Sequence, residues 1–295
     1  MVNIYEQISR NKIRSSLIIS LFSAFIILVA YLITQTYDLS GAFIAFAILF
    51  SIISSLGSYF YGDKMVLSMN RAQPANKNNY PLLYQVIENL SIANQTPMPK
   101  IYIISTNAAN AFATGRDPDH AVICVTTGLL PILNRSQLEA VIAHELSHIK
   151  NYDIRLMTIV SILIGSLSIL INMAYRSTFF RKNSNKENNQ ANTIIMLLGF
   201  VMIIFAPLIA KLIQLAISRR REYYADASAI KLTRQPQALI DALTKISNDD
   251  SVFETASTAT ASLYITNPFK NNKNASLFST HPPIEKRLQA LQQML

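Results

Sequence analysis

The residues best suited to chemistry form one short cluster, His144-Glu145-Leu146-Ser147-His148. Positions i and i+4 of a helix lie on one face, so both imidazoles can reach one zinc ion at ~2.0–2.1 Å. Glu145 projects beside them and can accept a proton from a zinc-bound water, whose pKa the metal lowers toward ~7. It can then pass that proton to a leaving amine. The spacing therefore predicts zinc-assisted hydrolysis of a peptide bond.

A catalytic zinc of this kind needs a third protein ligand and leaves its fourth position for water. Glu222 and Asp226 offer two carboxylates, again four residues apart. We expect Glu222 to be the ligand and Asp226 to accept a hydrogen bond from the far nitrogen of a liganding histidine. An ordinary solvated helix start would show the same spacing, and spacing alone does not separate the two interpretations.

The H-E-x-x-H motif is short enough to occur by chance, so the element that carries it matters. Ser136 and Glu139 fit a capping box just before an apolar run, which predicts the start of a helix. Leu138, Val141 and Ile149 give that helix a buried stripe. The alternative is a pair of core histidines. It is disfavoured because two buried histidines on either side of a glutamate each need a separate hydrogen-bond partner.

Four apolar stretches are long enough to cross a bilayer, which takes ~20 helical residues. They run from about Ser16 to Gln35, Gly41 to Tyr61, Leu156 to Tyr175, and Thr193 to Ile217. The expected organisation is a membrane hairpin (1–62), a first part of a protease domain (63–154), a second membrane pair (155–218) and a second part of that domain (219–295). The fold class is thus a mainly α integral membrane protein with four transmembrane helices.

The two soluble pieces predict one α+β domain with a small β-sheet. Strands are expected at Lys100–Ser105 and at Ala121–Thr127, which are rich in β-branched residues. The segment 107–119 between them holds turn-forming residues. Further helices are expected at Ser218–Leu232, Pro236–Ile246 and Pro283–Leu295.

The formal net charge of +9 comes with an apolar fraction of about half, which favours a membrane partner over nucleic acid. Basic residues flank the apolar runs at 10–14, 64–71 and 219–221, which lie on one side if all four spans cross. The rule that basic loops stay inside places that side in the cytoplasm, although the basic loop at 176–186 argues the other way. The single cysteine, Cys124, excludes an intrachain disulfide.

Three segments together resemble the HtpX-type heat-shock membrane metalloproteases of bacteria, relatives of the CAAX prenyl proteases. They are the H-E-L-S-H helix, the segment S-R-R-R-E-Y-Y-A-D at 218–226 and the turn S-T-H-P at 279–282. The resemblance covers nearly the whole chain. It implies a zincin-like domain with one catalytic Zn²⁺, and endopeptidase activity against misfolded or damaged membrane proteins. It also implies a site that faces the cytoplasm from the inner membrane, with Glu222 as third ligand and Asp226 supporting His144.

The same resemblance marks a segment beside the active site, Asn107-Ala-Ala-Asn-Ala-Phe-Ala113. An edge strand here would hold the substrate main chain by strand addition, which suits broad side-chain tolerance. We therefore expect substrate contacts from Asn107, Asn110, Ala111 and Phe112, with a purely structural turn as the open alternative.

Two further residues are expected near the metal. His281 would stabilise the oxyanion of the tetrahedral intermediate, with a packed turn histidine as the alternative. Arg287 is expected to pair with a site carboxylate such as Asp226. His120 has no matching partner and is interpreted as a loop residue.

Two competing interpretations remain at this stage. An intramembrane-cleaving zinc protease would carry its motif inside a span, but the motif helix has Arg135, Glu139 and Lys150 and is polar on one side. A zinc-stabilised membrane scaffold would need a fourth protein ligand, which His281 could supply. The expected partners are membrane protein substrates and the lipid bilayer, without nucleic acid, and self-cleavage is a reasonable hypothesis.

Overall fold

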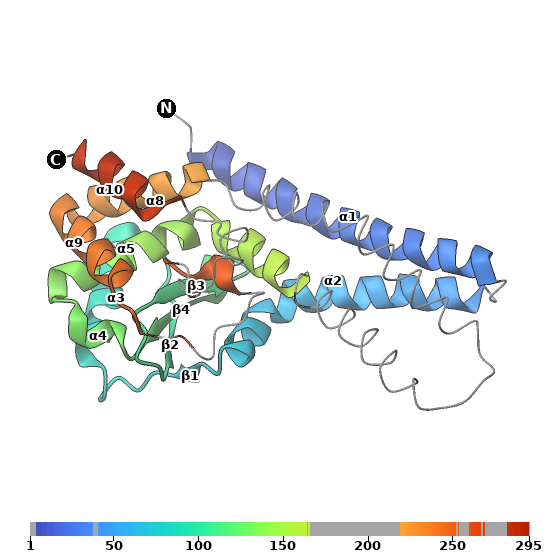
Figure 1. Cartoon of the computed structure of the whole chain (residues 1–295), viewed down its shortest axis with the longest axis horizontal. Helices are drawn as coiled ribbons and strands as arrows, with labels where there is room; N and C mark the ends of the chain where they lie inside the picture. The colour runs from blue at the N-terminus through green and yellow to red at the C-terminus, as the bar shows by residue number, and fades with distance from the viewer. Residues whose placement is uncertain are drawn as a thin grey trace.

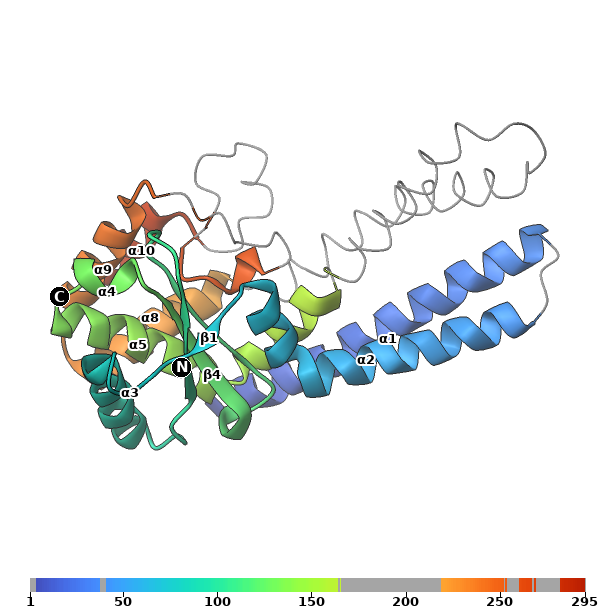
Figure 2. The ribbon, with the colours of Figure 1, turned by 90° about the horizontal axis from the view of Figure 1, so that it is seen from below.

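The computed structural model describes residues 4–37, 41–163, 165, 219–251, 253, 260–266, 268 and 282–294. Within these residues a long helical hairpin extends from a lobe in which helices pack against a small sheet (Figure 1). The hairpin consists of α1 (Ile4–Tyr37) and α2 (Ala42–Met69). Figure 2 shows the two helices running side by side away from the lobe.

The hairpin helices have the composition of membrane spans. Ile8–Leu28 and Ile44–Met69 are long and apolar enough to cross a bilayer, and only 22% and 18% of their respective windows are buried. Large apolar side chains point outward, including Ile13 at 64% and Phe46 at 63% exposure. An apolar surface of this extent suits lipid better than water. The first two predicted spans are therefore present as helices.

The third and fourth predicted spans are not tested in the same way. Residues 153–163 are helical, which covers the beginning of the third span. The rest of that span, and the fourth from Thr193 to Ile217, lie outside the described residues. The count of four membrane helices thus stays a prediction.

The lobe contains a four-stranded mixed sheet with strand order β1-β2-β4-β3. Its strands are β1 (Gln73–Pro74), β2 (Lys100–Ile104), β3 (Ala111–Gly115) and β4 (Ala121–Thr126). Strands β2 and β4 pair in parallel, while β3 pairs antiparallel with β4 at the edge. The two predicted strands are confirmed, each one residue shorter than expected.

The turn before β4 explains why β3 ends at a glycine. Gly115 has a φ of +135°, and a Cβ there would lie 2.4 Å from the main-chain oxygen of His120. A side chain is therefore excluded both by conformation and by space. The chain then passes through the short 3₁₀ turn η1 (Pro118–His120) into β4.

Helices cover the sheet and close around one apolar core. They are α3 (Pro81–Asn94), α4 (Leu129–Ile132), α5 (Arg135–Lys150), α8 (Arg219–Thr233), α9 (Pro236–Ser247), the 3₁₀ turn η3 (Ala261–Leu263) and α10 (Ile284–Gln292). The core combines Leu83, Val125 and Leu146 with Leu243 and Leu291. Residues before and after the region 166–218 thus share one buried cluster.

The predicted capping box of the motif helix was wrong by two residues. The N-cap is Asn134, whose side-chain oxygen accepts from the Gln137 main-chain nitrogen at 2.9 Å. Gln137 Oε1 in turn accepts from the Asn134 main-chain nitrogen at 3.1 Å. Because the helix starts earlier, Ser136 and Glu139 fall inside it, and Glu139 pairs with Arg135 at 2.9 Å. Asparagine and glutamine here make the same reciprocal pair of hydrogen bonds that the expected serine and glutamate would make two residues later.

Candidate metal centre

The two motif histidines lie one turn apart on α5, which packs inside the lobe rather than along the hairpin (Figure 1). Their Nε2 atoms are 3.2 Å apart, and the residues are 1% and 5% exposed. Glu222 lies on α8. Its Oε2 is 3.6 Å from Nε2 of His144, and its Oε1 is 3.6 Å from Nε2 of His148. Ligand atoms from His144, His148 and Glu222 all lie within 4.8 Å of one another. Two segments far apart in the chain thus converge on one point.

The donor set and its spacing suit a zinc ion. Two nitrogens each ~2.0–2.1 Å from one tetrahedral ion would lie about 3.3–3.4 Å apart, close to the observed separation. Each histidine turns its Nδ1 toward a carboxylate, so each Nε2 is left as an acceptor. Two acceptors this close together beside a buried carboxylate are favourable only with a cation or a proton between them.

His144 is held by what we call the Asp226 branch, comprising His144, Asp226 and Arg287. Nδ1 of His144 lies 2.9 Å from Asp226 Oδ1. Arg287, from α10, donates to both oxygens of Asp226, at 2.6 and 2.9 Å. Its Nη1 also donates to the Ile265 carbonyl at 3.1 Å and lies 3.6 Å from Glu222. Arg287 is 1% exposed, so this two-point ion pair is completely buried.

His148 is held by a second set, the Asp153 branch, comprising His148, Asp153, Asn11 and Arg221. Nδ1 of His148 lies 3.1 Å from Asp153 Oδ2. The other oxygen of Asp153 accepts from Asn11 Nδ2 at 2.7 Å and lies 3.4 Å from Arg221 Nε. Sequence reasoning missed Asp153 and Asn11. The available signal was an aspartate five residues after the second motif histidine, just beyond the predicted helix.

The conformation of one residue brings Asp153 back to the histidine. Tyr152 has a φ of +59°, a left-handed conformation that reverses the chain after α5. Its main-chain nitrogen donates to the Ile149 carbonyl at 3.1 Å, which closes the turn. Lys12 and Arg155 lie over its ring, at 4.5 and 5.1 Å from the centroid. These contacts stabilise a turn that a tyrosine seldom adopts.

The electrostatics of the site favour positive charge between the imidazoles. Burial alone would raise the pKa of Asp226, but the Arg287 charge and the hydrogen bond with His144 outweigh it and lower that pKa. Burial would lower the pKa of His144, yet the adjacent carboxylates of Asp226 and Glu222 raise it to about 9. Burial would also lower the pKa of His148, but the hydrogen bond with Asp153 outweighs burial and raises this pKa. A metal cation at the Nε2 atoms would replace the proton that these carboxylates attract.

Glu145 is 2% exposed and follows His144 directly on α5. Its negative charge is one of the causes that raise the pKa of Arg287. His281, the other expected catalytic residue, lies outside the described residues. His120 is exposed and bonds to Asp117 at 2.6 Å, in the turn before β4.

The expected substrate segment forms the edge strand of the sheet, but part of that edge is already bonded. Asn110 donates to the Thr266 carbonyl at 3.0 Å, and the Ala111 carbonyl accepts from Ile265 at 3.0 Å. The Phe112 ring is fully buried, 4.9 Å from the Tyr264 ring. Asn107 is exposed, in the loop before the strand, and a Cβ on Gly128 would meet its main-chain oxygen at 1.9 Å. The side chains of Asn110 and Phe112 thus face protein rather than an open cleft.

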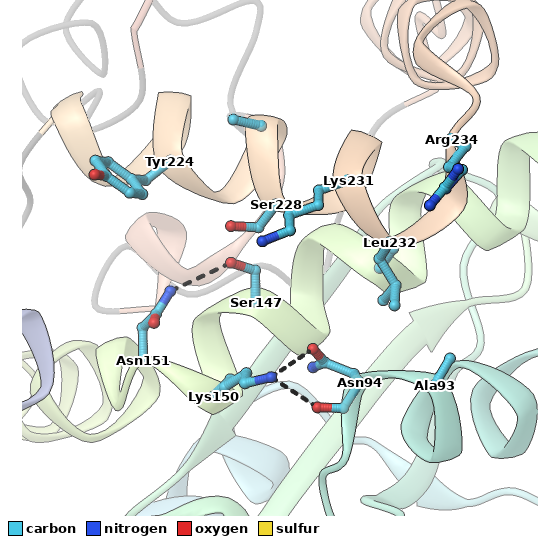
Figure 3. Close-up of a pocket in the computed structure, with 12 residues that line it drawn as sticks. Ala93, Asn94, Ser147, Lys150, Asn151, Tyr224, Ser228, Lys231, Leu232 and Arg234 are labelled. Carbon is cyan, nitrogen blue, oxygen red and sulfur yellow. Dashed lines mark hydrogen bonds between the residues drawn. The ribbon is translucent and has the colours of Figure 1, made fainter. Parts of the chain in front are cut away.

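A separate groove of about 620 Å³ lies between α3, α5 and α8 (Figure 3). Figure 3 shows Ser147 bonded to Asn151, and Lys150 bonded to the end of α3 at Asn94. None of the three metal-cluster residues lines this groove. It occupies another face of the α5–α8 pair and takes no part in the metal centre.

Comparison with known proteins gives a consistent result. The model of Peptidase family M48 matches residues 77–295. A Protease HtpX homolog of Dictyoglomus turgidum is 41% identical over 290 residues, covering 98% of this chain and 94% of that protein. A Protease HtpX homolog of Lactobacillus helveticus is 42% identical and covers 99% and 100%, respectively. The crystal structure of S. mikatae Ste24p, 21% identical, shares the fold with a TM-score of 0.51 over 97% of this chain and 67% of that one.

Proposed function

Because the chain belongs to peptidase family M48 and is a metallopeptidase, we propose that it is a membrane-bound zinc endopeptidase for misfolded or damaged membrane proteins. The observation that carries the proposal is the buried meeting of His144, His148 and Glu222, with both Nε2 atoms directed to one point. Three protein ligands would leave a fourth tetrahedral position, which a water molecule takes in this proposal. A scaffold without protease activity is not favoured, because the matching family and the relatives are peptidases.

In this proposal the three residues hold the ion, and their neighbours set its surroundings. A bound zinc ion would polarise the scissile carbonyl and lower the pKa of a water molecule to ~7. Asp226 and Asp153 keep hydrogen on the Nδ1 atoms, so that both Nε2 lone pairs face the ion. The buried surroundings exclude bulk water and strengthen every charge interaction at the site.

Glu145 takes the proton of the attacking water and delivers it to the leaving amine. Its position next to His144 fits this role, and its burial keeps the proton from bulk solvent. His281 is proposed to donate to the oxyanion of the tetrahedral intermediate, as expected from its place in the S-T-H-P turn.

Substrate is proposed to bind along the edge of β3 through main-chain hydrogen bonds. The structure supports this in one respect, since β3 has one strand neighbour in the described sheet. The bonds from Asn110 and Ala111 to residues 265–266 restrict pairing to the part of the strand beyond them. Asn107 and the main chain near Phe112 would then flank the substrate.

We further propose that α1 and α2 cross the bacterial inner membrane and that the lobe lies in the cytoplasm. The exposed apolar surface of both helices supports the first part. Basic residues at 10–14 and 64–71, where the hairpin meets the lobe, support the second. A broad protease at this surface could also cleave its own chain.

The direct test is casein cleavage by the detergent-purified full chain, with zinc content measured on the same samples. Wild type should cleave, a chelator should stop it, and Glu145→Gln should keep zinc while losing at least ~10²-fold in rate. If both proteins bind zinc and neither cleaves any protein substrate, the endopeptidase proposal fails and the scaffold interpretation gains support.

A further inference from the structure

The membrane helix α1 contributes a buried polar side chain to the supports of the metal centre. We propose that Asn11 is a positioning residue for the metal ligand His148, and that seating of α1 against the lobe and metal binding stabilise each other. This inference deepens the proposed zinc site and rests on it. It makes the membrane anchor part of the active centre rather than a tether.

The contacts of Asn11 are short and directed. Asn11 is 4% exposed, and its Nδ2 donates to the Asn151 carbonyl at 2.9 Å and to Asp153 Oδ1 at 2.7 Å. A carboxamide nitrogen has two hydrogens, so both are used. These contacts join positions 140 and 142 residues apart in the chain. Their geometry therefore depends on where α1 lies against the lobe.

The two acceptors of Asn11 both control the position of His148. Asp153 holds the far nitrogen of that histidine through its other oxygen, at 3.1 Å. Asn151 caps the C-terminus of α5, the helix that carries both motif histidines. One amide thus fixes the end of the ligand helix and the orientation of the carboxylate beyond it. A carboxylate that keeps hydrogen on Nδ1 also keeps the Nε2 lone pair for a metal.

Arg221 contacts the same carboxylate but cannot replace Asn11. Its Nε lies 3.4 Å from Asp153 Oδ1, a longer contact than the 2.7 Å of the amide. Both of its Nη atoms are buried, with no hydrogen-bond partner among the described residues. Arg221 therefore supplies positive charge next to Asp153, whereas the hydrogen bond from Asn11 fixes the orientation of the Asp153 carboxylate.

The surroundings of Asn11 on α1 suggest a specific purpose for a polar side chain. Two and six residues further along, Ile13 and Leu17 are 64% and 52% exposed and form the apolar outer face of the helix. A buried amide on such a helix is costly unless its hydrogen bonds are satisfied. Here they are satisfied only when α1 is docked on the turn at 151–153. Docking of α1 and alignment of Asp153 are therefore one event.

Binding linkage gives the consequence. If docked α1 favours metal binding, bound metal must favour docked α1 by the same factor. Removal of a carboxylate or similar partner behind a metal-bound histidine typically weakens metal affinity 10–100-fold. Because Asn11 acts one contact further away, we expect the lower end of that range, about tenfold.

The first test compares zinc affinity of the full chain in detergent by competition with a chromophoric chelator. Asn11→Leu removes the donor at similar size, and Ser15→Ala is the matched control. Ser15 is equally buried on α1, and within the described part of the chain its hydroxyl donates to the Asn11 carbonyl one turn back. We expect affinity to fall about tenfold for Asn11→Leu and to stay at the wild-type value for Ser15→Ala. Equal affinities for wild type and Asn11→Leu would overturn the inference while leaving the zinc site intact.

The second test uses the wild-type protein, so that a folding defect of the variant cannot obscure the result. Amide hydrogen exchange of residues 8–15 and 149–153 is measured with zinc and after its removal. Bound zinc should slow exchange in both segments, and Asn11→Leu, if folded, should lose the effect in the α1 segment. No zinc dependence in residues 8–15 would contradict the linkage. Failure of the wild type to bind zinc at all would refute the proposed function and this inference together.

Discussion

The Asp226 branch and the Asp153 branch each orient one histidine through its Nδ1 atom, but they do so with different contacts. His144 is backed by a buried carboxylate that a two-point arginine pair holds from within the lobe. His148 is backed by the carboxylate of Asp153. That carboxylate is held by the neutral amide of Asn11, from the membrane helix, and by the more distant Arg221. The first support is a matter of charge and burial inside one folded unit. The second depends on how two parts of the molecule dock, so it is the one that the membrane can influence.

The largest expected difference between the branches concerns their arginines. Arg287→Met leaves Asp226 and Glu222 without their buried counter-charge, so the free energy of unfolding should fall by about 3–5 kcal/mol. Arg221→Met removes a single contact of 3.4 Å from a side chain that is 11% exposed, and should cost about 1 kcal/mol. Denaturant unfolding of both variants in the same detergent would measure this. Equal losses of unfolding free energy in the two variants would contradict the view that buried charge supports His144 more strongly than it supports His148.

The next effect concerns the carboxylates themselves. Asp153→Asn keeps the size of the side chain but no longer enforces hydrogen on Nδ1 of His148, so zinc affinity should fall ~10–100-fold. Asp226→Asn should cause a loss of similar size and also destabilise the apo protein, because it leaves Arg287 unpaired in the core. Chelator competition and apo-protein melting together separate the two variants. Unchanged zinc affinity in Asp153→Asn would show that the second branch does not support the metal.

The smallest effect concerns the outer contact of α1 with the turn after α5. Lys12→Met removes the ammonium group 4.5 Å from the Tyr152 ring and should cost about 0.5–1 kcal/mol of stability. Zinc affinity should change less than about twofold, because Asn11 keeps its contacts. Lys64→Met is the control, since Lys64 lies over the Tyr61 ring, 5.4 Å from its centroid and within α2 itself. A loss of zinc affinity in Lys12→Met as large as in Asn11→Leu would mean that general docking of α1, rather than the amide, aligns Asp153.

The two branches also differ in how far the sequence predicted them. The contact between Arg287 and Asp226 was expected, although the resemblance to a known family placed only Asp226 beside a metal ligand and no motif singled out Arg287. Asn11 and Asp153 were not expected, since their contact joins the segment before a predicted membrane span to a predicted domain boundary. Hydrophobic periodicity identifies such segments but contains no information about which polar residue of one meets which residue of the other.

Local structure shows the same limit on a smaller scale. Strands β2 and β4 were predicted because β-branched runs between turn residues carry a strong signal. The edge strand β3 is rich in alanine and glycine, so only its place beside the active site was expected and not its register with β4. The capping box was misplaced because Asn134 and Gln137 have the same spacing as Ser136 and Glu139, and the extended backbone of Asn134 makes it the N-cap.

The most direct test of the metal centre compares two buried glutamates. Zinc per chain is measured after exhaustive dialysis for wild type, Glu145→Gln and Glu222→Ala, with folding checked by the helical signal of each sample. We predict about one zinc per chain for wild type and Glu145→Gln, and far less for Glu222→Ala, because only Glu222 is a ligand. Full zinc retention by folded Glu222→Ala, or loss of zinc from Glu145→Gln, would contradict the assignment of ligand and base.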